Sequence, residues 1–351
     1  MQKTKHSSFS GVEILPGTTM QEYLDELRIR HPRLYERLDL ARLDPTQLAR
    51  IYEALDCFAS PFDTKEHGGR GDAYRSTQLA HPLVRGRGIS NLCELAIPVD
   101  SSPARSLLLD ALGGNGTMTR AMRLLQPVTG PAIFTGDVAA PMIADALAQG
   151  LPAVRQATQR WLFRDAALDG VIFAYGTHHI PVDERPQAMA EAHRVLRPGG
   201  RIVVHDFEEG STTARWYSEA LDRYTYTGHK HDHFLREEMH ELLVTAGFHD
   251  VRVRYLYDPC VVDADSPAAA RRGVINYMYD LFALAKLVPP DALDDEDSWM
   301  IVDEVVRRYA TFGPDERARL GAQVAELTVR PAGRGFRAEL PRVALVATAT
   351  R

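Results

Sequence analysis

The 351-residue sequence predicts an α/β fold in which a mostly parallel sheet carries helices on both faces. Strand and helix patterns alternate from residue 106 onward, as is typical of parallel strands joined by crossover helices. The apolar run at 107–109 reads as a buried strand that breaks into a glycine-rich turn. A hydrophobic content of 45% supplies enough apolar side chains for a large core.

The strands and helices follow from this alternation. We expect seven strands, at 106–111, 132–136, 153–156, 170–175, 201–206, 251–257 and 343–348. The helices between them begin near Thr117, Pro141, Glu184, Glu219 and Glu237. Residues 266–334 separate the last two strands and contain two long helical patterns. We therefore expect a helical insertion that packs over the carboxyl edge of the sheet or against the N-terminal helices.

The N-terminal part predicts three short helices within residues 17–58. The first follows a cap at Thr18 or Thr19, the second is PRLYERLDLARL, and the third opens at Asp44 and Pro45. Residues 60–81, rich in glycine and charge, read as an exposed connection or lid. The expected domains are 1–100 as N-terminal helical cap, 101–265 as core, 266–334 as cap-forming insertion and 335–351 as the final core strand.

Composition excludes several classes of protein. A net charge of −6 and a pI near 6.1 argue against nucleic-acid partners. The three cysteines, Cys57, Cys93 and Cys260, are too far apart for a CxxC metal site and too few for a disulfide framework. With no signal peptide pattern and no apolar run long enough to span a membrane, we expect a cytoplasmic protein without a membrane partner. The sequence does not decide the oligomeric state.

The glycine-rich turn carries the most specific signal. Asp110, Gly114 and Gly116 form a D-x-x-x-G-x-G frame, which is neither a dinucleotide fingerprint nor a P-loop. This frame resembles motif I of the class I, Rossmann-like methyltransferases that depend on S-adenosylmethionine (SAM), and RVLRPGG at 194–200 resembles a further signature of that superfamily. The resemblance implies SAM as cofactor, and a seven-stranded sheet whose last strand is antiparallel. Leu112 stands where the superfamily usually has its first glycine, close to the methionine end of SAM.

Further cofactor-binding residues follow from this resemblance. Asp137 ends the second strand, where an acidic residue can accept hydrogen bonds from both ribose hydroxyls. The alternative role for Asp137 is to cap the following helix. Thr158 or Gln159, after the third strand, stands where the superfamily contacts adenine, although Gln159 is equally compatible with an exposed loop amide.

Candidate catalytic residues follow the fourth and fifth strands. Tyr175 could face the sulfonium through cation–π attraction or be an ordinary core tyrosine, and His178 or His179 could act as a base or shape the wall. Asp206 could hold an amine, act as base, or solvate the strand end. A run at 229–233 has histidines at alternate positions, and we expect a mobile loop there with no metal.

Three functions remain open. The first is methyl transfer by in-line displacement to a small molecule of specialised metabolism. The second follows from Leu112: the amine of SAM attacks its own γ-carbon, which releases methylthioadenosine and azetidine-2-carboxylate and requires no second substrate. The third is a SAM-binding module without catalysis.

Overall fold

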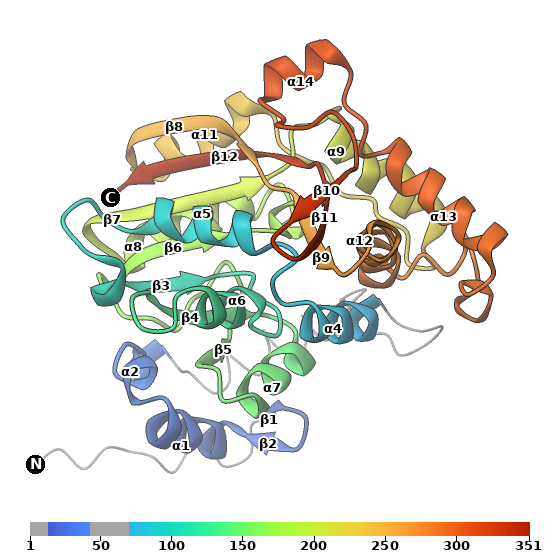
Figure 1. Ribbon diagram of the computed structural model, residues 1–351. Coiled ribbons are helices and arrows are strands. Elements are labelled where there is room, and N and C mark those ends of the chain that lie inside the picture. The colour runs from blue at the N-terminus through green and yellow to red at the C-terminus, as the bar shows by residue number, and fades with distance from the viewer. Residues whose placement is uncertain (1–12, 43–69) are drawn as a thin grey trace, which may run out of the picture.

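The computed structural model describes residues 13–42 and 70–351, and its centre is a seven-stranded sheet (Figure 1). The strand order is β5-β4-β3-β6-β7-β12-β8, and β12 alone runs antiparallel to its neighbours. The predicted fold class is therefore confirmed, and so is each of the seven strands. The strands are β3 Leu107–Asp110, β4 Ala132–Asp137, β5 Ala153–Arg155, β6 Leu168–Phe173, β7 Leu196–Asp206, β8 His249–Tyr257 and β12 Val343–Thr350.

Helices cover both faces of this sheet because its strands are apolar on both sides. In β3, Leu107 and Leu109 join one buried cluster and Leu108 joins the other, as the alternation of side chains along a strand requires. Helices α5 and α6 pack on one face and α8 and α11 on the other (Figure 1). The core helices are α5 Gly86–Ala96, α6 Thr117–Leu125, α7 Ala140–Ala148, α8 Arg185–Val195, α9 Thr212–Arg215, α10 Asp222–Tyr224 and α11 Arg236–Thr245, with a π-helical turn at Trp216–Leu221 and 3-10 turns at Pro103–Arg105 and Thr177–His179.

The N-terminal segment begins with a two-stranded hairpin, β1 (Glu13–Leu15) and β2 (Thr18–Thr19), followed by α1 (Met20–Arg30). Thr19 and Glu22 form a capping box at α1, which confirms the predicted start.

The second predicted helix is much shorter than expected. It yields only α2 (Pro32–Tyr35) and a 3-10 turn at Leu40–Arg42, because the chain between them leaves the helix and Leu38 forms a β-bridge with Phe163. The third predicted helix, from Asp44, lies outside the described residues.

The predicted connection at 60–81 is partly wrong, because residues 70–80 form helix α4 (Arg70–Ala80). This helix packs on α12 (Pro267–Phe282), where the Gln78 amide donates to the Tyr277 hydroxyl at 3.3 Å in a buried contact. Tertiary contact therefore stabilises a helix that its polar composition did not indicate. The insertion packs against the N-terminal cap in this way, as expected (Figure 1).

The rest of the insertion is helical, with one small sheet that the sequence did not predict. Strand β11 pairs with β10 and β9 in an antiparallel sheet, so residues 335–340 do not belong to the final core strand, which begins at Val343. Ion pairing between Arg337 and Asp263 at 2.7 Å joins β11 to β9. The remaining elements are α13 Glu296–Arg308, α14 Pro314–Leu320, β9 Cys260–Ala264, β10 Thr328–Ala332, β11 Gly335–Leu340 and a 3-10 turn at Pro290–Ala292.

Neither described range contains a helix long and apolar enough to cross a membrane. Cys93 and Cys260 are buried free thiols, and Cys57 lies outside the described residues.

Candidate active site

The predicted site residues meet at the carboxyl edge of the sheet. Asp110, Asp137 and Asp206 end β3, β4 and β7, and Tyr175 follows β6 by two residues. The strand order reverses between β3 and β6, and ligands of open α/β sheets bind in the crevice at such a switch point. Helices α4 and α12 lie at this same end of the strands (Figure 1).

The turn after β3 needs its glycines. Gly114 and Gly116 have φ values of +53° and +83°, which favour glycine. A Cβ on Gly116 would lie 2.4 Å from Leu151 Cδ1, and one on Gly113 would lie 2.7 Å from Thr135 Cγ2. Gly113 therefore packs tightly against β3 and β4, while Leu112 beside it is half-buried. The turn leads straight into α6, whose N-terminal amides favour a negative group nearby.

Asp110 is buried under this turn. Burial, and then the nearby Asp137 carboxylate, raise the pKa of Asp110 to about 7, while the Arg85 guanidinium opposes this rise. Asp110 can therefore hold a proton near neutral pH until another cation approaches it.

Asp137 fixes the glycine turn to the end of β4. Its carboxylate accepts hydrogen bonds from the backbone N–H of Gly114 at 2.8 Å and of Ala139 at 2.9 Å. The second bond goes to the residue before α7, a helix that has no side-chain cap, so Asp137 does not take the helix-capping role that the sequence left open. Each carboxylate oxygen has two lone pairs, so these contacts leave capacity for ribose hydroxyls.

The two predicted adenine residues contact each other and a neighbouring helix. Thr158 Oγ1 donates to Gln159 Oε1 at 3.4 Å, and the Gln159 amide donates to Glu184. A better-placed amide was missed. Gln156 is 3% exposed, its Nε2 has no hydrogen-bond partner among the described residues, and a Cβ on Gly136 would lie 2.9 Å from that atom. Gln156 could have been found from its position, because it ends the predicted third strand, two residues before Thr158.

Tyr175 adopts a strained backbone at the end of β6, with φ of +61°. Its hydroxyl donates to Asp258 Oδ1 at 3.3 Å, and its ring centroid lies 4.3 Å from the Arg85 guanidinium carbon. Arg342 donates to the other oxygen of Asp258 at 2.6 Å. The cation over the Tyr175 ring in this structure is therefore the Arg85 guanidinium, whereas the sequence predicted the sulfonium of SAM.

Arg85 is a functional candidate that sequence reasoning missed. It is 4% exposed, donates to the Tyr74 hydroxyl at 3.1 Å, and its Nε has no partner among the described residues. A Cβ on Gly114 would lie 3.7 Å from the Tyr74 ring, so Tyr74 of α4 lies beside the glycine turn. The hydrogen bond to Tyr74 holds Arg85 near the same turn. No motif marks either residue, because both lie in the N-terminal cap.

His178, His179 and Asp206 lie together at this edge, and the loop at 229–233 joins them. His178 Nδ1 and His233 Nδ1 each lie 2.9 Å from an Asp206 oxygen, and His179 Nδ1 lies 3.1 Å from His231 Nε2. The two imidazoles on Asp206 outweigh its burial, which acts in the opposite direction, and lower the pKa of its carboxyl far below the usual range. An ionised carboxylate only accepts hydrogen bonds, so both rings donate Nδ1–H to Asp206, and a neutral imidazole held in this way has its lone pair on Nε2. Such an imidazole can accept a proton or coordinate a metal ion.

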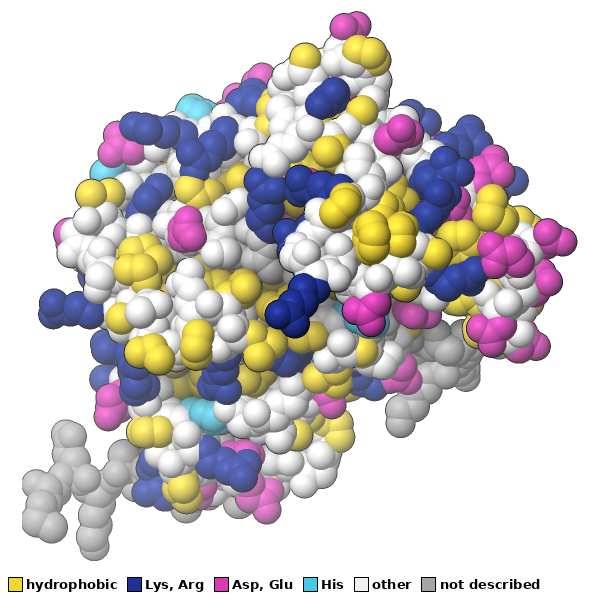
Figure 2. Space-filling view, in the orientation of Figure 1, with side chains coloured by type: hydrophobic (Ala, Val, Ile, Leu, Met, Phe, Trp, Pro, Cys, Tyr) yellow, Lys and Arg dark blue, Asp and Glu magenta, His cyan; other side chains and the backbone are white. Residues whose placement is uncertain are grey.

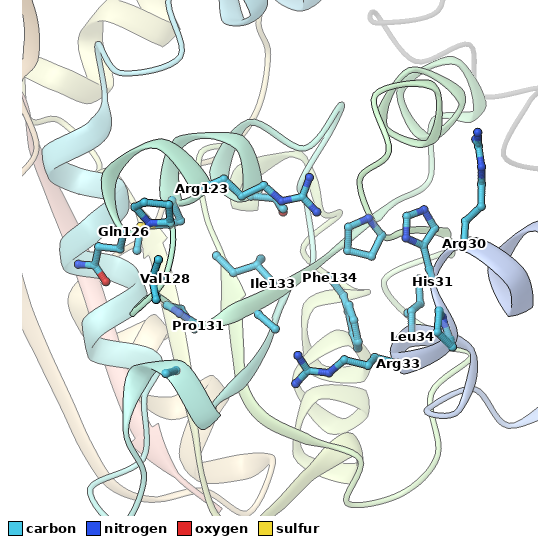
Figure 3. Close-up of a pocket in the computed structure, with 18 residues that line it drawn as sticks. Arg30, His31, Arg33, Leu34, Arg123, Gln126, Val128, Pro131, Ile133 and Phe134 are labelled. Carbon is cyan, nitrogen blue, oxygen red and sulfur yellow. The ribbon is translucent and has the colours of Figure 1, made fainter.

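A separate surface pocket lies away from this site. Figure 3 shows it between α1, α2 and the end of α6, with Arg30, Arg33 and Arg123 around its rim. Its remaining lining includes Pro131 and Ile133 at the amino end of β4. It is therefore at the opposite edge of the sheet from Asp110 and Asp137, and we assign no cofactor to it.

The carboxyl-edge residues fit SAM. The glycine turn allows close backbone approach, and Gln156 and Arg85 both have buried N–H groups that lack a partner among the described residues. The edge offers acidic side chains that can accept hydrogen bonds from the ribose hydroxyls of SAM. It also offers a basic side chain that can bind the carboxylate of its amino-acid part.

Comparison with known proteins agrees with this reading. Residues 109–204 match the family described as "Methyltransferase domain". The ubiquinone/menaquinone biosynthesis C-methyltransferase UbiE of Stutzerimonas stutzeri (strain A1501) is 29% identical over 159 residues, which are 42% of this chain and 59% of that protein. Demethylmenaquinone methyltransferase of Thermus thermophilus is 32% identical over 119 residues, 32% of this chain and 50% of that protein. The chain thus spans about half to three-fifths of these curated relatives.

Solved structures resemble the chain more distantly. The YcgJ protein of Bacillus subtilis is 14% identical, covers 78% of this chain and 99% of its own, and has a TM-score of 0.44. Phosphoethanolamine N-methyltransferase 2 of Haemonchus contortus, in complex with phosphomonomethylethanolamine and S-adenosylhomocysteine, is 13% identical and has a TM-score of 0.46. The match covers 83% of this chain and 59% of that one. Both TM-scores are low, and the fold rests on the strand order given above.

Proposed function

We propose that this chain is a member of the class I, Rossmann-like superfamily of SAM-dependent methyltransferases and that it transfers the methyl group of SAM to a small molecule. The match of residues 109–204 to a methyltransferase domain supports this proposal. The observation that carries the proposal is that one edge of the sheet holds both the glycine turn and the His178–Asp206 pair. SAM supplies an electrophilic methyl group on a sulfonium. The chain's own residues have to bind the cofactor, orient the acceptor and exclude water.

For cofactor binding, we assign Asp137 to the ribose and the turn at Asp110, Leu112, Gly114 and Gly116 to the methionine end. Arg85 is the buried cation that can bind the carboxylate of that end. Thr158 and Gln159 remain candidates for adenine, together with Gln156, whose amide N–H lacks a partner among the described residues.

For the acceptor side, we assign Tyr175, His178, His179 and Asp206. The acceptor's nucleophilic atom would approach the imidazoles, with Asp206 holding His178 in one tautomer. The cap formed by α4 and α12 covers this edge, which favours an acceptor small enough to be enclosed. On the face in Figure 2, Lys and Arg side chains are interspersed with acidic and hydrophobic ones rather than gathered into one basic field. We propose a small molecule of specialised metabolism, and the relatives' names add quinones as a class to test.

The first experiment incubates the purified full chain with SAM alone, then with SAM and a panel of small acceptors that includes a demethylated quinone, and separates the products by mass spectrometry. We expect S-adenosylhomocysteine and a methylated product only when an acceptor is present. Methylthioadenosine and azetidine-2-carboxylate from SAM alone would instead establish attack on the γ-carbon and contradict methyl transfer.

A paired variant tests the acceptor side separately. His178→Gln should lower the rate of product formation by at least tenfold while the Kd for SAM changes less than twofold, because His178 lies on β6's side of the site and Asp137 on β4's. Equal losses of rate in His178→Gln and in His240→Gln, an exposed histidine of α11, would contradict the assignment.

A further inference from the structure

Five histidines from two distant segments form one cluster beside Asp206. His178 and His179 follow β6, and His229, His231 and His233 lie in the loop between α10 and α11. The His178 ring centroid is within 4.4–5.9 Å of the other four ring centroids. All three histidines of the loop therefore lie close to His178, and His229 and His231 also lie close to His179, which the sequence alone did not indicate.

We propose that this cluster binds a divalent transition-metal ion of the zinc type through His178, His179 and His229. One nitrogen from each of these three rings lies within 4.8 Å of the others. Imidazole is a preferred ligand of zinc, cobalt and nickel, and a bond length of about 2.0–2.1 Å requires the rings to close by roughly an ångström. His179 is half-buried, so this ligand can make that movement.

Asp206 orients the ligands rather than joining them. A second triad, His178, Asp206 and His233, also brings its ligand atoms together. The Asp206 oxygens, however, already accept from two backbone N–H groups, those of His178 and Phe207, both at 2.7 Å, as well as from the two imidazoles. A carboxylate that receives Nδ1–H fixes the tautomer and directs Nε2 toward a metal, which is the usual arrangement of metal-binding histidines.

His233 gives independent support. Its side chain is fully buried, and its Nε2 has no hydrogen-bond partner among the described residues. A buried polar nitrogen without a partner destabilises a fold unless a further group satisfies it. An ion beside His178 would provide that group through a metal-bound water, whose hydrogen bond the His233 nitrogen would accept.

The site would have a position left for an exchangeable ligand. Three protein imidazoles leave the fourth tetrahedral position open, as catalytic rather than structural zinc sites do. His178 and His179 are residues that the proposed function assigns to the acceptor, so the ion could bind an oxygen or nitrogen of the acceptor. This use of the ion rests on the proposed function, whereas binding of the ion does not.

The test is metal binding by the untagged full chain. Chelator-treated protein is titrated with Co²⁺, followed by visible absorption, and with Zn²⁺, followed by calorimetry. We expect one ion per chain with a tetrahedral Co²⁺ spectrum. His179→Gln and His229→Gln should weaken binding at least 100-fold, and Asp206→Asn should weaken it about 10- to 100-fold. His240→Gln, the exposed control, should bind as the unmodified chain does.

Circular dichroism and the Kd for SAM show that each variant remains folded. His179→Gln is the decisive variant, because its half-buried side chain disturbs the packing least. Absence of one-to-one binding in the unmodified chain, or equal affinity in His179→Gln and His240→Gln, would overturn the proposal. Methyl transfer by a chain that binds no metal would overturn it while leaving the proposed function intact.

Discussion

Arg85 joins three features of the site through one buried guanidinium. It packs over the Tyr175 ring, donates to the Tyr74 hydroxyl and lowers the pKa of the otherwise raised Asp110 carboxyl. A buried cation with an unsatisfied N–H favours an anionic ligand, because an unpaired charge is costly in a medium of low dielectric. The carboxylate of SAM is the anion that the proposed function brings to this position.

Arg85→Gln should therefore raise the Kd for SAM about 10- to 100-fold, because the variant loses one hydrogen bond between charged groups. The same variant should change the Kd for decarboxylated SAM less than threefold, since that analogue lacks the carboxylate. Arg87→Gln, an exposed neighbour in α5, serves as control for both ligands. Calorimetry measures all six affinities, and equal weakening of the two ligands by Arg85→Gln would contradict this contact.

Asp110 predicts a pH dependence of stability. Burial and the Asp137 carboxylate raise its pKa from 3.8 to about 7. Between these two values the folded chain keeps a proton that the unfolded chain has released, so the free energy of unfolding falls as the pH rises through this window. Asp110→Asn cannot ionise and should lose that part of the slope, roughly 2–4 kcal/mol between pH 4 and pH 8.

Urea unfolding at pH 5, 6, 7 and 8 measures this difference for both chains. Titrating groups away from Asp110 and Asp137 contribute equally to both, so the quantity of interest is the difference between the two slopes, which belongs to this coupled pair. Parallel curves would show that Asp110 ionises normally in the folded chain.

The position of a residue was predictable from the sequence where a motif places that residue at the end of a strand. Asp110, Asp137 and the glycines lie at the edge that their spacing implied, because the end of a parallel strand has only one place in the sheet. Arg85, Tyr74 and Asp258 were missed because their own segments carry no motif, and because the contacts of Arg85 and Asp258 with Tyr175 join segments distant in sequence. The alternate histidines of the loop at 229–233 were visible in the sequence, but their proximity to His178 depends on tertiary packing.

At the scale of elements, α4 and α12 close the cap through a small polar contact. Gln78 and Tyr277 are almost fully buried, and their hydrogen bond joins the two helices. Tyr277→Phe leaves the Gln78 amide N–H without this acceptor, which costs about 1–3 kcal/mol. We expect faster amide hydrogen exchange in residues 70–80, because the helix opens more often.

Tyr279→Phe is the matched control for this prediction. Tyr279 lies on the same helix and is also buried, but its hydroxyl donates to the Val288 carbonyl at 2.7 Å and not to α4. This variant should leave exchange in 70–80 unchanged while it loosens the loop near Val288. The same increase in both variants would mean that α12 as a whole, rather than the Gln78 contact, determines the position of α4.

The elements of the core were predictable and those of the cap were less so. Core strands are apolar on both faces, so composition alone marks them, as in LLLD at 107–110. Helix α4 is polar and depends on α12 for its burial, and β9, β10 and β11 pair across the insertion with alternating polar residues. Pairing between distant segments is the step that a single sequence does not determine.

At the scale of the whole molecule, one consequence of SAM binding is independent of the acceptor. A ligand that binds only the folded chain adds about 2.7 kcal/mol at a concentration 100 times its Kd. For a chain of this length, that corresponds to an increase in Tm of roughly 3–5 °C. Asp137→Ala should abolish most of the increase, because it removes both the proposed ribose contact and the Gly114 hydrogen bond that holds the turn.

Differential scanning fluorimetry with SAM, S-adenosylhomocysteine and adenosine measures this shift. Asp183→Ala, an exposed carboxylate before α8, controls for a general change in charge and should keep the full increase. Asp137→Ala without ligand will itself melt lower, so the increase on adding ligand, rather than the absolute Tm, is the informative quantity. A full increase in Asp137→Ala would assign the ribose to other residues, whereas no increase in the unmodified chain would remove SAM from the edge of the sheet altogether.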